Sequence, residues 1–455
     1  MSGRVDVAVV GAGPAGLAVA HALTGAGRSV RVLEAAEAVG GRMRTLREHG
    51  CLIDTGAEML PPATSYPATW RLIGELGLDT DRGAVPRIRG ALAVWRRGRV
   101  RPYAGRPLGL LTGAGLSARA RADLLRLQLR LARAGLDPER PERSPLGART
   151  LADLLRPYHP ELRERLLGPL AAGFFGWDPD QVAAAPFAAH LASAGSSARW
   201  RTYRDGMDTL TRALASRLDV ATRHPVTGVT VLPEGVRLDS PAGTVTAHAA
   251  VLAVPAPIAA RLHPRAPDTE RDYLDACGYA PMLRISLVLD RPVEPVRARG
   301  GFVTLVPAPE DPLLNAVTVD HNKHPDRAGN GHGLVSLIAS PRGTAELLDA
   351  SDEHAADTLA ARAEHLMPGL RRRIEAVYVH RFRYGLPAPG PEAIRRRPAF
   401  VTRPPAAVDY AGDWTALRPC SEGAISSAAI ASERILAFLT STAERTPAAT
   451  TPTEE

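Results

Sequence analysis

A glycine-rich segment near the N-terminus has the residue types and spacing that hold a pyrophosphate. The segment G-A-G-P-A-G (residues 11–16) follows the apolar, β-branched run Val5–Val10 and opens an Ala- and Leu-rich stretch. Gly11 permits a tight strand-to-helix turn, Gly13 lets the backbone approach phosphates, and Gly16 lets helix and strand pack closely. Because N–H groups at a helix start favour anions, this segment predicts dinucleotide binding.

An acidic residue stands where the ribose of such a ligand would lie. Glu34 follows a second predicted strand, residues 30–33, and lies 23 residues after Gly11. Its carboxylate can accept hydrogen bonds from both ribose hydroxyls and would repel a 2′-phosphate. The ligand is therefore expected not to be NADP-like, but this region does not separate FAD from NAD.

Two further motifs favour FAD. Residues 40–45 read G-G-R-M-R-T and residues 54–59 read D-T-G-A-E-M, and Arg42 can meet a phosphate or the electron-rich edge of a flavin. With segment 11–16 and Glu34, these motifs resemble the FAD superfamily of amine oxidases, protoporphyrinogen oxidases and carotenoid or squalene desaturases. In that family E-A-x-x-x-x-G-G-R-x-x-T and D-x-G-A are familiar signatures.

The resemblance recurs in family order along most of the chain. Residues 203–210 resemble the G-G-M-x-x-L segment, and residues 251–255 resemble the V-x-A-x-P strand. The resemblance implies that the backbone of Val226 meets the adenine and that Asp413 bonds the ribityl–phosphate region. It also implies that the E-G-A turn, residues 422–424, directs helix N–H groups at the N1/O2 edge of the flavin, where reduced flavin carries negative charge.

The motifs together predict a set of cofactor-binding residues and a mode of attachment. The set is Gly11, Gly13, Ala15, Gly16, Glu34, Gly41, Arg42, Gly56, Ala57, Glu58, Met59, Val226, Gly412, Asp413, Glu422, Gly423 and Ala424. The cysteine-containing segment that attaches FAD covalently in some relatives is not recognisable. We therefore expect noncovalent FAD and no bound metal.

The predicted substrate side departs from the amine oxidases. Many of them place a lysine on a substrate-domain strand, and the comparable strand here, residues 283–289, carries Arg284. Arg284 is the one catalytic candidate; arginine can hold a water but cannot usefully titrate. Lys323, the single lysine of the chain, is expected in a surface loop. Cys420 stands where many amine oxidases have an aromatic cage residue, which argues against a cation cage.

Three functions stay open, and a small-molecule substrate is the expected partner in the first two. The first is a dehydrogenase or desaturase that passes hydride to flavin N5, since residues 167–180 and 411–415 resemble protoporphyrinogen oxidases and desaturases. The second is an amine or amino-acid oxidase, in which Arg284 pairs a substrate carboxylate. The third is a non-catalytic escort on the same fold. No second G-x-G-x-x-G is present, so O2 or another acceptor is expected to reoxidise the flavin.

The order of the elements predicts an α/β architecture with a discontinuous domain. A Rossmann-like FAD-binding domain is expected from residues 1–75, 205–265 and 395–440. An α+β substrate domain, with a mixed sheet and a helical subdomain, is expected from residues 76–204 and 266–394. Residues 441–455 are Thr-, Pro-, Ala- and Glu-rich and are expected to be disordered.

Composition and charge indicate which partners and which cellular compartment to expect. The 455 residues carry a net charge of +8, but aromatic residues are scarce (5%) and no nucleic-acid motif is found, so no nucleic-acid partner is expected. Arginines at 119, 126, 130 and 133 share one face of a predicted helix, residues 117–131, which leaves peripheral membrane contact open. Three scattered cysteines, no leader and no apolar stretch of spanning length favour a cytoplasmic protein.

Overall fold

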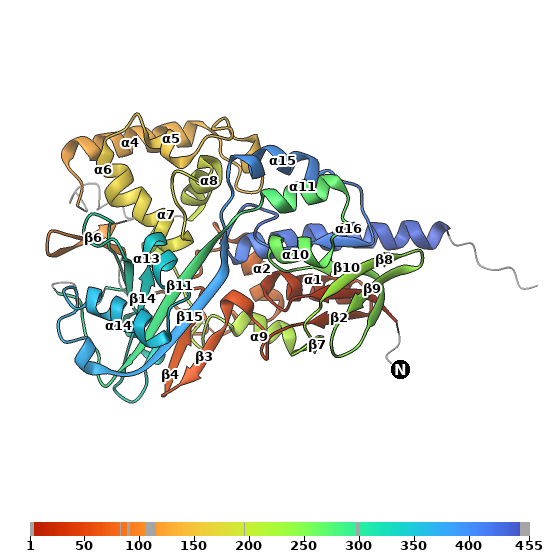
Figure 1. Ribbon diagram of the computed structural model, residues 1–455, viewed down its shortest axis with the longest axis horizontal. Coiled ribbons are helices and arrows are strands. Elements are labelled where there is room, and N and C mark those ends of the chain that lie inside the picture. The colour runs from red at the N-terminus through yellow and green to blue at the C-terminus, as the bar shows by residue number, and fades with distance from the viewer. Residues whose placement is uncertain are drawn as a thin grey trace, which may run out of the picture.

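Two sheets and a group of helices make up the molecule (Figure 1). The computed structural model describes residues 4–81, 83–88, 92–104, 115–194, 196–296 and 301–445. One sheet lies with α1 and α16, the other lies with α13 and α14, and helices α4 to α8 gather above the second sheet in this view. The fold is α/β, as the sequence predicted.

The first sheet contains the dinucleotide-binding strands. In the described part of the chain it has seven strands in the order β7-β2-β1-β10-β9-β8, with β16 also paired to β10. The pairs β1–β2, β1–β10, β2–β7 and β10–β16 are parallel, and β8–β9 and β9–β10 are antiparallel. The strands are β1 (Val5–Val10), β2 (Val30–Leu33), β7 (Asp219–Ala221), β8 (Gly228–Leu232), β9 (Gly235–Asp239), β10 (Val245–Leu252) and β16 (Val408–Tyr410).

Apolar helices cover this sheet because their buried faces are rich in Ala and Leu. Helix α1 packs against α16 over the sheet, so the two ends of the chain share one core (Figure 1). Strand β1 is fully buried over its last four residues, as expected of a central parallel strand. The helices of this part are α1 (Pro14–Gly25), α2 (Pro67–Glu75), α9 (Thr209–Ala215), α10 (Ala256–Leu262), α11 (Asp268–Ala276), α15 (Pro391–Val401) and α16 (Ser421–Arg445).

The second sheet is mixed, as the sequence predicted. Its order is β15-β11-β14-β13-β12-β5-β6, and the β12–β5 pair is parallel while the other pairs are antiparallel. Its strands are β5 (Leu92–Arg96), β6 (Arg99–Ala104), β11 (Tyr279–Leu289), β12 (Val303–Leu305), β13 (Leu314–Val319), β14 (Gly333–Ala339) and β15 (Ile374–Pro387). A separate hairpin, β3 (Thr45–Glu48) and β4 (Cys51–Asp54), leads into residues 54–59.

The remaining helices form a separate group or pack against the second sheet. The helical group comprises α4 (Ala118–Arg133), α5 (Leu151–Leu155), α6 (Pro160–Leu162), the π-helix η3 (Arg163–Leu167), α7 (Gly168–Phe175) and α8 (Ala184–Ala194). Against the second sheet lie α12 (Asp320–Lys323), α13 (Pro341–Leu347) and α14 (Asp352–Ala363). Short 3-10 turns are η1 (Gly41–Met43), η2 (Pro141–Arg143), η4 (Ser197–Arg199), η5 (Pro325–Arg327) and η6 (Arg371–Arg373).

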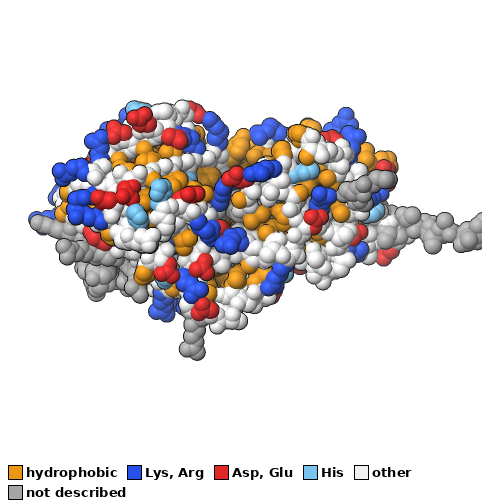
Figure 2. Space-filling model, turned by 90° about the horizontal axis from the view of Figure 1, so that it is seen from below, with side chains coloured by type: hydrophobic (Ala, Val, Ile, Leu, Met, Phe, Trp, Pro, Cys, Tyr) orange, Lys and Arg blue, Asp and Glu red, His pale blue; other side chains and the backbone are white. Residues whose placement is uncertain are grey.

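Helix α4 presents arginines at the surface, and helix α16 extends beyond residue 440. Helix α4 is capped by Ser117, whose Oγ accepts from the N–H of Ala120 at 3.3 Å, and its arginines at 119, 126, 130 and 133 are exposed. On the face in Figure 2, basic and acidic side chains are interspersed. Helix α16 includes residues 441–445 of the segment expected to be disordered; residues 446–455 lie outside the described residues.

Candidate active site

The glycine-rich turn between β1 and α1 leaves open space in front of the helix. Gly11 has φ of 103° and a Cβ there would lie 2.8 Å from the carbonyl oxygen of Ala253, while a Cβ at Gly16 would lie 1.9 Å from that of Gly11. A Cβ at Gly13 would meet nothing within 4 Å, and no side chain caps α1 there. Ala15 is buried in the first turn. The N–H groups of this turn therefore suit a pyrophosphate.

Glu34 organises the neighbouring loop. Its Oε2 accepts from the N–H of Ala12 at 2.7 Å and its Oε1 accepts from the N–H of Ala36 at 2.8 Å. The carbonyl of Glu34 also accepts from the N–H of His224 at 2.8 Å, which places the loop of half-buried Val226 beside it. A carboxylate oxygen accepts more than one bond, so Glu34 could still bind a ribose.

Arg42 links the second motif to the C-terminal one. Its Nη1 and Nη2 donate to the two carboxylate oxygens of Asp413 at 2.8 and 2.9 Å, and Nη1 also donates to the carbonyl of Gly385 at 3.0 Å. Gly41 and Gly412 have φ of 51° and 154°, in the region that favours glycine. The two motifs thus meet in space, as residues that hold one ligand must.

Residues 54–59 pack against the segment that contains Arg42 and also reach the cavity described below. The N–H of Ala57 donates to the carbonyl of Arg42 at 2.9 Å, and a Cβ on Gly56 would lie 2.5 Å from that carbonyl oxygen. Glu58 and Met59 line the cavity described below. The glycine is needed because the two motifs touch through their backbones.

The C-terminal turn shows a contact that the sequence did not reveal. The carboxylate of Glu422 accepts from the N–H of Ala68 at 2.9 Å, and from the N–H and Oγ1 of Thr69 at 2.8 Å each. It therefore caps the start of α2 from a distant part of the chain. A Cβ on Gly423 would lie 2.1 Å from a backbone carbonyl, and Ala424 lines the cavity.

A cavity of about 300 Å³ lies between these motifs and the second sheet. Pro14, Arg42, Ala57, Met59, Asp413 and Ala424 line one side. The opposite side is mainly apolar and includes Leu170, Phe174, Phe187, Val303, Ile338 and Phe382. Such a concave, largely apolar site with few polar groups is the kind that binds a cofactor and a small molecule.

Two neutral polar side chains also line the cavity. Nδ1 of His190 and Nε1 of Trp200 are buried, and neither has a hydrogen-bond partner among the described residues. Burial lowers the pKa of His190 to about 3, with a smaller effect from Arg418, so the imidazole is neutral. Unpaired buried polar atoms are uncommon in proteins, but these two lie beneath the cavity surface, since each is buried.

One wall of the cavity is backed by a buried charge cluster. We use this name for Asp54, Glu58, Arg284, Asp320, Lys323 and Arg327. Their side chains are between 0 and 9% exposed. Only Glu58 and Arg284 of the six line the cavity.

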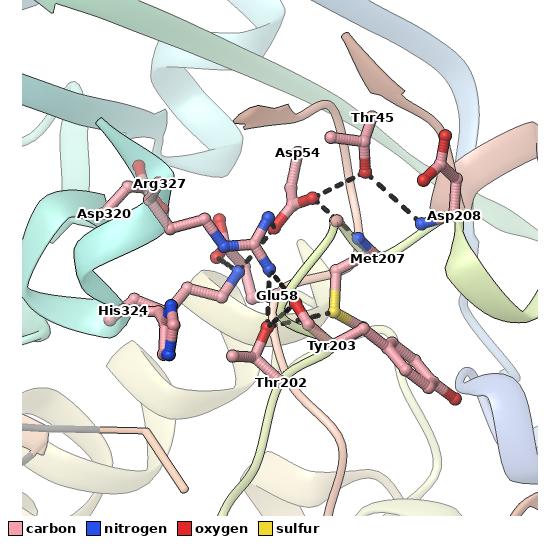
Figure 3. A network of polar contacts seen from close by, with 12 residues as sticks. Thr45, Asp54, Glu58, Thr202, Tyr203, Met207, Asp208, Asp320, His324 and Arg327 are labelled. Carbon is pink, nitrogen blue, oxygen red and sulfur yellow. Dashed lines mark hydrogen bonds and ion pairs between the residues drawn. The ribbon is translucent and has the colours of Figure 1, made fainter. Parts of the chain in front are cut away.

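Asp54 is the centre of one half of the cluster. Its Oδ2 accepts from Lys323 Nζ at 2.6 Å and pairs with Arg327 Nη1 at 2.9 Å, while its Oδ1 accepts from Thr45 and from the N–H of Met207 (Figure 3). Burial alone would raise the pKa of Asp54, but the two cations hold it well below its usual range. Asp54 is therefore ionised at neutral pH.

Glu58 and Arg284 form the half that reaches the cavity. Arg284 Nη1 donates to Glu58 Oε1, and Lys323 Nζ donates to Glu58 Oε2 at 2.9 Å. Arg284 Nη2 donates to Ser336 Oγ at 2.7 Å and lies 3.6 Å from Asp320 Oδ2. Arg284 lines the cavity, but its guanidinium is held by carboxylates of the chain itself, and its catalytic role stays a prediction.

The expectation that Lys323 lies in a surface loop was wrong. Its side chain is 0% exposed, and α12 places it directly after the buried strand β13. Burial lowers the pKa of Lys323 to about 8, against the opposing effect of Asp54. The apolar strand before it was a signal that this segment enters the core, although its carboxylate partners could not be read from the sequence.

Cys420 lies in the cavity wall beside Tyr66. Burial raises the pKa of the Cys420 thiol, so the thiol stays protonated at neutral pH. The same cause raises the pKa of Tyr66. Cys420 is thus a small, neutral wall residue. Among the described residues no group of His, Cys, Asp and Glu side chains could hold a metal ion.

Comparison with known proteins identifies the family. The model of the family "Flavin containing amine oxidoreductase" matches residues 14–436. The putative flavin-containing monoamine oxidase AofH of Mycobacterium tuberculosis is 28% identical over 354 residues, which are 73% of this chain and 74% of that protein. Putrescine oxidase of Kocuria rosea is 45% identical over 75 residues, which are only 16% of this chain and 15% of the relative.

Solved structures share the fold at low sequence identity. A double mutant of putrescine oxidase superposes with a TM-score of 0.76 at 20% identity, covering 95% of this chain and 99% of the other. A putative protoporphyrinogen oxidase from Exiguobacterium superposes with a TM-score of 0.73 at 21% identity, covering 97% and 100%. The likeness therefore extends over both sheets.

The chain belongs to the flavin-containing amine oxidoreductase family. It is an FAD-dependent oxidoreductase, as predicted; noncovalent attachment of the cofactor stays a prediction. The geometry agrees, because open space lies in front of Gly13 at the start of α1, and Pro14, Arg42 and Asp413 line the cavity. Within the described residues, no helix is long and apolar enough to cross a membrane.

Proposed function

We propose that this enzyme dehydrogenates an apolar, uncharged small molecule by the hydride-transfer chemistry that its resemblance to protoporphyrinogen oxidases and desaturases implies. The observation that supports this most is the cavity, which combines a mainly apolar lining with a charge-balanced wall. Three carboxylates face three cations in the cluster behind that wall, so no net charge is offered to a substrate. A charged substrate would lose its hydration there without gaining a counter-ion.

The cofactor is proposed to lie along the motifs at one side of this cavity. The residues proposed to hold it are the seventeen expected from the sequence, from Gly11 to Ala424, with Glu422 acting through its backbone because its carboxylate caps α2. When bound, FAD supplies the hydride acceptor of the reaction. The division into an FAD-binding and a substrate domain at residues 75, 204, 265 and 394 is part of the same proposal.

The chain's own residues are proposed to bind and orient the substrate. Apolar side chains such as Phe174 and Phe382 exclude water and pack against the substrate. Arg284 is held by Glu58 and Ser336, so we propose that it orders the wall rather than removing a proton. The guanidinium stays charged and cannot act as a base at neutral pH.

The electron acceptor of the flavin and the cellular location of the enzyme are also proposals. We propose that O2 or another small acceptor reoxidises the flavin, because the sequence holds a single G-x-G-x-x-G segment. A cytoplasmic location is supported by three free cysteines, two of them buried. Contact of the exposed arginines of α4 with an anionic membrane stays a prediction.

A second candidate is amine oxidation. It is favoured by one observation, that the carboxylate of Glu58 lines the cavity and could meet an ammonium group if a cationic partner were lost. The similarity to the putative monoamine oxidase AofH supports it too. Amino-acid oxidation is less well supported, because Arg284 is already paired with chain carboxylates.

The visible spectrum of the purified protein separates these functions. Anaerobic mixing with neutral polyenes should bleach the oxidised flavin bands, whereas mixing with amines, or with reduced tetrapyrroles that carry carboxylates, should not. Bleaching by amines, with peroxide released on admitting air, would establish the second candidate instead. A colourless protein that cannot be reconstituted with FAD would overturn both and leave the escort.

A further inference from the structure

Glu58 is a carboxylate at the wall of an otherwise apolar cavity. By itself it would attract a cation into the cavity, as buried carboxylates do. Two cations of the chain prevent this: Arg284 shares the cavity wall with it, and Lys323 donates to its Oε2 at 2.9 Å. The charge that a substrate meets therefore depends on both partners.

Lys323 differs from Arg284 in its position. Its side chain is 0% exposed and is not part of the cavity wall. It bridges Glu58 Oε2 at 2.9 Å and Asp54 Oδ2 at 2.6 Å, with its ammonium group also 5.7 Å from the centre of the Phe302 ring. It thus neutralises a cavity residue without occupying any of the space in which a substrate would lie.

The balance of the cluster makes this one charge decisive. Asp54, Glu58 and Asp320 face Arg284, Lys323 and Arg327, three charges of each sign. Loss of the ammonium charge leaves one negative charge in excess, and Glu58 is the carboxylate through which it reaches the cavity.

We propose that Lys323 is a specificity-determining residue, which excludes cationic amines from the cavity by neutralising Glu58 from behind its wall. The inference rests on the proposed function, because it explains how a family of amine oxidoreductases can hold a member that takes neutral substrates. Lys323 does not touch the substrate and acts through Glu58.

The groups around Lys323 agree with this role. Asp54 faces it from β4, Glu58 from the following loop, Arg284 from β11, Arg327 from η5 and Asp320 from its own helix. On β15, the pKa of His380 is lowered to about 3 by burial and by Arg284, so this neighbour adds no charge. Burial lowers the pKa of Lys323 to about 8, so its charge is lost within an accessible pH range.

Three probes that share a benzene ring test the proposal by binding rather than turnover. Benzylamine is a cation, benzyl alcohol is neutral and benzoate is an anion at pH 7. Their affinities for the FAD-loaded enzyme are measured from calorimetry or from shifts of the flavin bands. The wild type should prefer benzyl alcohol. In Lys323→Met the affinity for benzylamine relative to benzyl alcohol should rise by about tenfold or more, because Glu58 becomes unpaired on one side.

Matched variants supply the opposite and the restored charge. Glu58→Gln leaves one positive charge in excess and should raise the relative affinity for benzoate by about tenfold. The double variant Lys323→Met/Glu58→Gln is balanced again and should return to the wild-type order of affinities. A merely structural lysine would give no such reversal of sign between the two single variants.

The pH dependence gives a test that needs no mutation. Benzylamine affinity of the wild type should rise as pH passes about 8, where Lys323 loses its proton, while benzylamine itself stays charged to about pH 9. The rise should be missing in the double variant.

Several outcomes would overturn the proposal. A wild type that binds benzylamine better than benzyl alcohol at pH 7 would do so, as would a folded Lys323→Met with an unchanged affinity ratio. If Lys323→Met does not fold, an unchanged benzoate ratio in Glu58→Gln, or a flat pH profile, overturns it equally. These results are distinct from failure of the proposed function, which is decided by which substrate class bleaches the flavin.

Discussion

Arg42 and Asp413, 371 residues apart in the chain, are joined by two parallel hydrogen bonds of 2.8 and 2.9 Å. The pair connects η1, which follows the first β-α-β unit, to the turn after β16. Asp413 is almost fully buried, with a side chain 4% exposed, whereas that of Arg42 is 32% exposed. Bidentate pairs of this kind fix orientation as well as distance. The pair therefore holds an N-terminal and a C-terminal segment of the chain together at the wall of the cavity.

Breaking this pair should destabilise the protein. Arg42→Met leaves Asp413 buried without its counter-ion, and we expect a loss of about 2 kcal/mol, since the arginine is partly exposed. Thermal unfolding of the FAD-free protein measures the loss. In the double variant Arg42→Met/Asp413→Asn the carboxylate charge is gone, so the combined loss should be smaller than the sum of the single ones. Additive losses would mean that the pair does not form.

One added methyl group should weaken FAD binding at Gly13 but prevent folding at Gly16, a glycine of the same turn. Gly13→Ala should fold normally, because nothing lies within 4 Å of the new Cβ, but FAD affinity should fall by tenfold or more as the methyl group fills the phosphate space. Gly16→Ala should not fold stably, since its Cβ would lie 1.9 Å from the carbonyl oxygen of Gly11. Circular dichroism and flavin content separate the two effects. Unchanged FAD affinity in Gly13→Ala would place the pyrophosphate elsewhere.

Glu422 should matter for stability more than for the flavin. Glu422→Gln removes the charge that three donors of α2 meet, and we expect a loss of about 1–2 kcal/mol in thermal unfolding. The flavin spectrum and FAD affinity should be unchanged within twofold. Glu433→Gln, on the exposed part of the same helix, is the matched control and should leave stability within about 0.5 kcal/mol of wild type. A shifted flavin spectrum in Glu422→Gln would show that the carboxylate contacts the ring.

The sequence predicts what depends on local chemistry. Gly11, Gly13 and Gly16 predict a strand, a turn and a helix start, because in each case a side chain would clash with backbone or ligand close by. The start of α4, which Ser117 caps, follows from a pattern of the same short range, whereas the mixed second sheet was implied by the family resemblance. Arg284 was singled out through the family resemblance, which compares its apolar strand with the lysine-bearing strand of many amine oxidases.

What the sequence does not predict is the choice of partners across long distances. Lys323 meets Asp54 across 269 residues, and Glu422 meets Thr69 across 353. A polar run such as residues 320–324 favours a surface loop unless buried counter-charges are known, and those come from another sheet. The charge cluster is therefore a property of the assembled fold, although Glu58 and Arg284 could each be named separately.

Asp54 should make the protein sensitive to acid. Burial opposes its ionisation, but Arg327 and Lys323 hold its pKa well below the usual range, so the unfolded chain takes up this proton first as pH falls. The stability that Asp54 contributes is then complete above about pH 4, the value at which an unfolded aspartate titrates, and is lost as pH falls further. Asp54→Asn should cost about 3–5 kcal/mol at pH 7, because two buried cations lose their partner.

The difference between wild type and Asp54→Asn should shrink as pH is lowered. Thermal unfolding of both proteins from pH 7 to pH 3 measures it, and the gap should stay constant down to about pH 4.5 before it narrows. The control is Asp205→Asn, an exposed carboxylate next to Gly206 in the segment that contacts Asp54. Its effect should stay within about 0.5 kcal/mol at every pH. A gap that is independent of pH would mean that Asp54 is not ionised in the folded protein, and the charge cluster would then lose its centre.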